Sequence, residues 1–190
     1  NSKKFYGFAF SNCYHYYDKS KKYKKFLNKQ LPTGDILNSL LKFYFVKLST
    51  IIIKKKVIKQ FQFNSNYSII GDFDFIIKIS EKYKGMAFQD FLVNIRIHKN
   101  NFTHNNRGIF YKEFKNWLKE QNFKKYHFKN NEIKLKEKLE YLRLINLLLN
   151  FKNYSLILDI LRFPFSILKL KLLVIYFLPD FLIKLKLKYF

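Results

Sequence analysis

Alternating and β-branched apolar positions predict three strands. In FYGFAFSNC, residues 5–13, aromatic side chains recur at every second position, which is the period of a strand covered on at least one face. A β-branched run predicts a second strand from Leu48 to Ile53. A third is expected in FLVNIRIHKNN, residues 91–101, where apolar and polar residues alternate.

Two short helices are expected outside these strands. A Lys-rich loop over residues 18–30 leads to Pro32 and Gly34, which mark a turn, and Asp35 can cap the apolar-periodic run that follows. Further along, Tyr111 to Glu120 has the pattern of a short exposed helix with its apolar side chains on the core.

A longer amphipathic helix is predicted over residues 68–83, and it begins with two carboxylates. Its apolar residues recur at three and four, at Ile69, Ile70, Phe73, Ile76, Ile77 and Tyr83. A spacing of two residues is about 200° of helical rotation, so Asp72 and Asp74 should flank the buried stripe on opposite sides and not share one metal or proton. Helix capping is one interpretation of both, because helix N-termini favour negative charge.

The strand end at residues 94–98 combines a cation with an imidazole. Alternation places Arg96 and His98 together on its polar face. A lone His at such a place is most often a hydrogen-bonded surface residue. His104 follows in an Asn-rich loop and lacks the spacing of a zinc pair.

The last third of the chain is apolar, with Lys at intervals. Pro164 and Pro179 divide its apolar runs, and the uncharged piece from Leu172 to Pro179 is far shorter than the roughly 20 residues of a membrane helix. Basic amphipathic segments of this type can lie on an anionic membrane surface, or they can pack on the domain or form a dimer face.

Composition adds a strong positive charge. The 190 residues contain 37 Lys and Arg against 13 Asp and Glu, a formal charge of +24. Arg is scarce among the basic residues, which favours AT-rich coding over base reading, although attraction to anionic lipid or phosphate is also open. The one cysteine, Cys13, cannot form an internal disulfide, which suits a reducing cytoplasm.

Three segments in order resemble the C-terminal half of family 2 glycosyltransferases with the GT-A fold. They are LPTGDILNSLLKFYFVKLSTIIIKKKVI, FNSNYSIIGDFDFIIKISEKYKG and VNIRIHKNNFTHN. The resemblance covers roughly Phe5 to Trp117. It implies an α/β fold, with the C-terminal part of a Rossmann-like GT-A catalytic domain over residues 1–125 and a basic amphipathic helical tail over residues 126–190.

The resemblance also implies roles for individual residues. Asp72 matches the carboxylate that takes the proton from the acceptor hydroxyl in an inverting transfer from a nucleotide sugar, and a carboxylate among apolar neighbours suits that role. Gly71 stands where the family usually has Glu, so an acceptor contact by that side chain is missing. Asp74 matches the second acidic position and is expected to have a structural role or to bind or orient the acceptor, and Gly34 matches a glycine loop near the donor.

A metal-dependent pyrophosphate site is implied by the strand end. His98 matches a histidine that helps a divalent cation, Mg²⁺ or Mn²⁺, to hold the pyrophosphate, and Arg96 could contact phosphate. The main metal ligands, in an Asp-x-Asp motif, would belong to an N-terminal half. The chain begins at Asn1 with neither Met nor a signal-peptide pattern, so we expect a fragment that is inactive alone.

The expected partners follow from this family. They are a nucleotide-sugar donor, a saccharide or lipid-linked acceptor of cell-surface polysaccharide or lipopolysaccharide synthesis, and an anionic membrane bound through the tail, on the cytoplasmic face of the plasma membrane. No specific nucleic acid is expected. The alternatives are a non-catalytic binder of nucleic acid or another anionic polymer, and a structural membrane-associated module.

Overall fold

The computed structural model describes residues 4–150 and 155–179, and the chain forms two compact units. The first contains residues 1–98 and 122–131, and the second contains residues 99–121 and 132–190. The predicted division after residue 125 lies within the 122–131 segment and stays a prediction.

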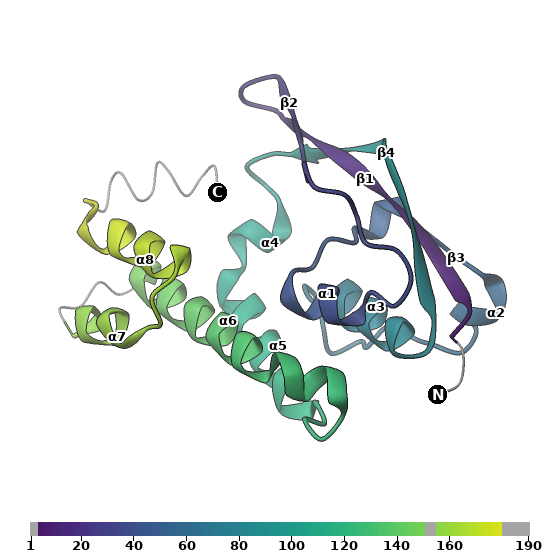
Figure 1. The fold of residues 1–190 in the computed structure, drawn as a ribbon. Coiled ribbons are helices and arrows are strands. Elements are labelled where there is room, and N and C mark those ends of the chain that lie inside the picture. Colours follow the sequence, from purple (N-terminus) through teal and green to yellow (C-terminus); the bar gives the residue numbers. More distant parts are fainter. Residues whose placement is uncertain (1–3, 151–154, 180–190) are drawn as a thin grey trace. The chain divides into compact units, whose positions relative to one another are not determined.

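The first unit is built on a mixed four-stranded sheet (Figure 1). Its central strand is β1, Tyr6–Tyr17, which pairs in parallel with β4, Lys84–Ile97. The strands β2, Lys22–Lys25, and β3, Ile51–Ile53, pair with β1 in the antiparallel sense. The fold is therefore mixed α/β, and the described residues contain no doubly wound parallel sheet of the Rossmann type.

Two differences from the expected strands concern β1 and its partners. The segment expected as a Lys-rich loop contains β2, which forms a hairpin with β1 in the register Tyr14 to Lys25 and Tyr17 to Lys22. The strand expected from Leu48 begins instead with a 3₁₀ turn, η1, Leu48–Thr50, before β3. This turn is closed by the Thr50 hydroxyl, which donates to the Lys47 carbonyl at 2.9 Å.

Three helices complete the first unit. They are α1, Leu37–Lys42, α2, Lys55–Ile58, and α3, Gly71–Lys82. Helix α3 confirms the amphipathic helix predicted there. Helices α1 and α3 contact each other and lie on one side of the sheet (Figure 1). The buried core of this unit includes Phe8, Phe10, Leu37, Leu40, Ile76 and Ile79.

The second unit is helical. Its helices are α4, Phe102–Asn105, α5, Arg107–Glu120, α7, Leu156–Arg162, α8, Ile167–Phe177, and most of α6, Tyr126–Asn150, which begins in the first unit. Its apolar cluster comprises Leu144, Ile145, Leu148, Leu156, Ile160, Phe163 and Leu172.

Within the described ranges, the tail expected over residues 126–190 is helical. Pro164 separates α7 from α8, as the sequence predicted. None of the described helices combines the length and apolarity that a membrane span requires. Residues 151–154 and 180–190 of the expected tail lie outside the described residues.

Candidate functional site

Asp72 lies in the first turn of α3 and is half-buried. Its Oδ1 accepts a hydrogen bond of 2.7 Å from the Phe73 backbone N–H, and the adjacent helix N-terminus also favours its negative charge. The residue that precedes the helix, Ile70, makes no side-chain hydrogen bond to the first turn. The hydrogen bond to the Phe73 N–H therefore comes from Asp72, inside the helix.

Burial raises the pKa of the Asp72 carboxyl group. The loss of solvation is the largest effect, and it outweighs the opposing effects of the Phe73 N–H, the Lys47 ammonium and the Tyr44 hydroxyl. A carboxylate in this environment is more basic than one in water, so it can accept a proton from an alcohol more readily.

Tyr44 and Lys47 precede β3 and bring two polar groups toward Asp72. Burial raises the pKa of Tyr44, and the negative charge of Asp72 raises it further. The Tyr44 hydroxyl is buried and lies close enough to the Asp72 carboxyl group for each to shift the pKa of the other, although it forms no hydrogen bond of full geometry within residues 4–150 and 155–179. The Tyr44 ring contacts the Phe73 ring edge to face at 5.3 Å.

The Lys47 side chain lies over an aromatic ring. Its Nζ is 4.5 Å from the centroid of Phe26, a cation–π contact. Burial lowers the pKa of Lys47, and the negative charges of Asp72 and of an ionised Cys13 would oppose that shift. Lys47 therefore supplies a partly desolvated positive charge next to the candidate base.

β1 contributes the remaining polar groups. His15 packs against Phe26 with ring centroids 5.1 Å apart, and burial, followed by the charge of Lys47, lowers its pKa. Cys13 is fully buried, and burial raises the pKa of its thiol. We call Asp72, Tyr44, Lys47, Cys13 and His15 the Asp72 cluster.

Asp74 does not belong to this cluster. Its side chain is only 3% exposed, and it forms an ion pair with Lys78 at 2.6 Å along α3. The sequence placed it beside the buried stripe, whereas it lies within that stripe and is stabilised by this pair. A role in binding or orienting the acceptor stays a prediction.

Arg96 and His98 lie on the other side of the sheet from the Asp72 cluster. Arg96 pairs with Tyr16 in the register of β1 and β4, whereas His15 pairs with Ile95, so their side chains point to opposite faces. The Arg96 guanidinium binds the Asp18 carboxylate at 2.7 to 2.8 Å, and His98 is exposed and lies near Asp18.

The structure therefore does not bring His98 and Asp72 together. Within the described ranges there is also no group of three or more His, Cys, Asp or Glu side chains that could hold a metal ion. The described His, Cys, Asp and Glu side chains therefore do not by themselves form a site for a divalent cation. The metal role of His98 and phosphate binding by Arg96 stay predictions.

Gly34 has a backbone role. Its φ of +95° is in the region that favours glycine, and it forms an isolated antiparallel bridge with Gly85 at the start of β4. The two backbone hydrogen bonds of this bridge are 2.8 and 2.9 Å long. Its role near a donor stays a prediction.

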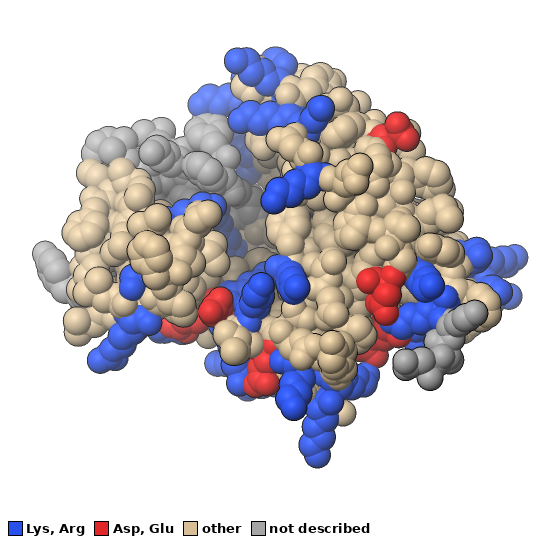
Figure 2. Space-filling view, in the orientation of Figure 1, with Lys and Arg blue, Asp and Glu red and all other residues tan. Residues whose placement is uncertain are grey.

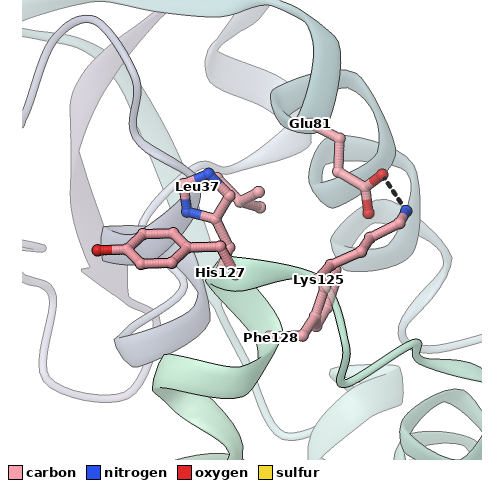
Figure 3. Close-up of a pocket in the computed structure, with 6 residues that line it drawn as sticks. Leu37, Glu81, Lys125, His127 and Phe128 are labelled. Atoms are coloured by element: carbon pink, nitrogen blue, oxygen red, sulfur yellow. Dashed lines mark hydrogen bonds and ion pairs between the residues drawn. The ribbon is translucent and has the colours of Figure 1, made fainter. Parts of the chain in front are cut away.

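A separate pocket of the first unit does not include the Asp72 cluster. It is about 280 Å³ in volume and is lined by Leu37, Glu81, Lys125, Tyr126, His127 and Phe128. Figure 3 shows Lys125 turned toward Glu81, and their ion pair of 2.8 Å closes one side. Glu81 and Lys125 pair with each other, whereas the Nδ1 of His127 is buried without a hydrogen-bond partner among the described residues.

Two neighbours of Asp72, and a histidine next to Lys47, were missed by sequence reasoning. Tyr44 and Lys47 are three residues apart in the segment that precedes β3, and His15 lies on β1. The only available signal was that Tyr44 and Lys47 belong to the first of the three segments that carry the resemblance.

No family model matches the sequence, and no curated protein or solved structure matches it at a significant level. The family resemblance therefore rests on the residues alone.

Proposed function

We propose that this chain is the C-terminal part of a GT-A-type inverting glycosyltransferase, and that Asp72 is its general base. Two independent lines support the proposal. The three segments occur in the order and spacing of such enzymes, and Asp72 is a half-buried carboxylate whose pKa is raised by desolvation beside a cation. The mechanism depends on the second observation, the half-buried Asp72 carboxylate with its raised pKa.

In the proposed reaction, an acceptor hydroxyl hydrogen-bonds to the Asp72 carboxylate. As the hydroxyl oxygen attacks the anomeric carbon of a nucleotide sugar, its proton passes to Asp72. The bond from that carbon to the diphosphate oxygen breaks on the opposite side, and the nucleoside diphosphate leaves with the electron pair. The configuration of the sugar carbon is therefore inverted.

The neighbours of Asp72 have distinct contributions. The Lys47 ammonium stabilises the ionised carboxylate, so that Asp72 is available as a base at neutral pH although burial raises its pKa. The Tyr44 hydroxyl favours the ionised form of the same carboxyl group. A moderately raised basicity with the charged form retained is what a general base requires.

The test is Asp72→Asn in the full-length natural protein, with UDP-, GDP- and dTDP-hexoses as donors and oligosaccharide acceptors. Loss of a general base lowers kcat by about 10² to 10⁴-fold. Donor affinity should stay close to wild type, because the amide keeps the shape of the side chain. The exposed Asp90 provides the matched control, Asp90→Asn, which should keep full activity. Wild-type turnover in Asp72→Asn would refute the assignment.

We also propose that the α7–α8 region binds an anionic membrane surface, which the sequence led us to expect on the cytoplasmic side. These two helices and the segment between them expose large apolar side chains at Leu158, Leu161, Phe165, Ile167, Leu170, Val174 and Phe177. Lys169 and Lys171 lie among them on α8, which is the combination that binds an interface. Flotation with phosphatidylglycerol vesicles should recover the protein, and Phe165→Ser with Phe177→Ser should reduce recovery. Equal recovery on phosphatidylcholine alone would contradict an anionic surface.

A further inference from the structure

Four aromatic rings form a continuous row on one face of the sheet, at the hairpin end. Phe91 and Tyr14 stack at 4.5 Å between centroids, and Tyr23 contacts Tyr14 at 6.3 Å and Tyr16 at 4.8 Å. They come from β1, β2 and β4, and Tyr23 is 58% exposed.

A lysine lies at each end of this row. The Lys25 Nζ is 5.3 Å from the Phe91 ring centroid, and the Lys21 Nζ is 6.0 Å from that of Tyr16. Both lysines are exposed. In Figure 2, blue side chains gather at the top of the molecule, where Figure 1 places this hairpin. We call Phe91, Tyr14, Tyr16, Tyr23, Lys21 and Lys25 the tyrosine face.

The tyrosine face and the Asp72 cluster lie on opposite sides of β1. Tyr14 and Tyr16 alternate along the strand with His15, which packs against Phe26 on the side of Lys47. A ligand of the tyrosine face is therefore held away from the Asp72 carboxylate.

We propose that the tyrosine face binds an anionic glycan chain, at sugars distant from the one that reacts. The proposal rests on the glycosyltransferase function and names its acceptor class. Phenol hydroxyls can donate and accept hydrogen bonds with sugar hydroxyls, and the two lysines attract carboxylates or phosphates on the chain.

The contacts within the row favour a glycan over single-stranded nucleic acid. Nucleic-acid bases bind by stacking on open aromatic faces. Here Tyr14 and Phe91 stack on each other, so one face of each ring is covered, and Tyr16 and Tyr23 are tilted against each other by 42°. The nearby Arg96, which would be the best stacking cation, is held by Asp18.

The test measures binding of fluorescent octagalacturonate to the protein by anisotropy, over a series of salt concentrations. The double variant Lys21→Gln, Lys25→Gln should weaken binding about tenfold. The matched control, Lys55→Gln with Lys56→Gln, removes the same charge from exposed positions on α2 and should change binding less than about twofold. Tyr23→Ser should also weaken binding without unfolding the exposed site.

Two further probes decide the ligand class. Neutral maltooctaose should bind more weakly than octagalacturonate, and so should octauridylate. Absence of binding by the wild type, equal losses in both lysine variants, or tighter binding of octauridylate would each overturn the proposal. These binding measurements need neither donor nor turnover, whereas the catalytic assignment is tested by the turnover of Asp72→Asn, so a failure of the tyrosine face can be told apart from a failure of the catalytic assignment.

Discussion

Replacing Gly34 by Ala separates a backbone role from a role in donor binding. At φ +95° an L side chain is strained, which costs roughly 1–2 kcal/mol. No atom lies within 4 Å of the added Cβ, so no steric clash contributes. Ala also restricts the unfolded chain, which returns about 0.4–1 kcal/mol. The expected net loss is about 1 kcal/mol of unfolding free energy, or about 2–4 °C in Tm for a chain of this size.

Urea unfolding followed by circular dichroism measures this loss. Gly34→Asn should be less destabilised than Gly34→Ala, because Asn tolerates positive φ. Gly108→Ala on α5 is the control: its nearest contact is 3.5 Å, and it should gain up to about 1 kcal/mol from helix propensity. Wild-type stability in Gly34→Ala, together with lost donor binding, would refute the backbone explanation and support a donor contact.

Three other substitutions test packing and charge. Gly85→Ala places a Cβ 2.8 Å from two Phe8 ring carbons and should cost about 1–3 kcal/mol in urea unfolding; a loss below that range would show that the ring can move. Folding raises the pKa of Asp72, so the native state binds this proton more tightly than the unfolded state. The free energy of unfolding of the wild type should therefore fall as the pH rises above the unfolded pKa of about 3.9. Asp72→Asn should therefore be more stable than the wild type at neutral pH, and this gain should vanish below that unfolded value; a gain that persists there contradicts the titration. Arg143→Gln removes the partly exposed ion pair of 2.7 Å between Arg143 on α6 and Asp159 on α7. The free energy of unfolding should fall by at most about 1 kcal/mol, and by less in 1 M NaCl than in 50 mM NaCl. A loss that does not depend on salt would indicate a packing effect instead.

The elements that sequence reasoning predicted are those whose burial follows a period. Helix α3 buries its apolar stripe at helical spacing, and residues 93–98 alternate between half-buried and exposed. The strand β2 could not be found in this way, because all four of its residues are exposed and its pairing with β1 alone defines it. A Lys-rich run with no buried positions has no alternation of apolar and polar residues from which a strand could be predicted.

The candidate base was predicted from its motif, but its environment was not. Tyr44 and Lys47 are 25 or more positions away from Asp72 in the sequence, and they approach it only because α3 and the segment before β3 pack on the same side of the sheet. The side of the sheet on which Arg96 lies could not be predicted either. Strand alternation predicted that Arg96 and His98 share one face, but β4 ends at Ile97, and only the register of β1 with β4 shows which face Arg96 occupies.

The alternation of β1 also constrains how the two proposals fit together. Tyr14 and Tyr16 face one side and His15 the other, so no single sugar can contact the tyrosine face and Asp72 at once. An acceptor that uses both must be long enough to pass around an edge of the sheet. Short acceptors should then react without help from Lys21 and Lys25, whereas long anionic acceptors should depend on these lysines through KM and not through kcat, because the lysines bind the chain far from the bond that forms.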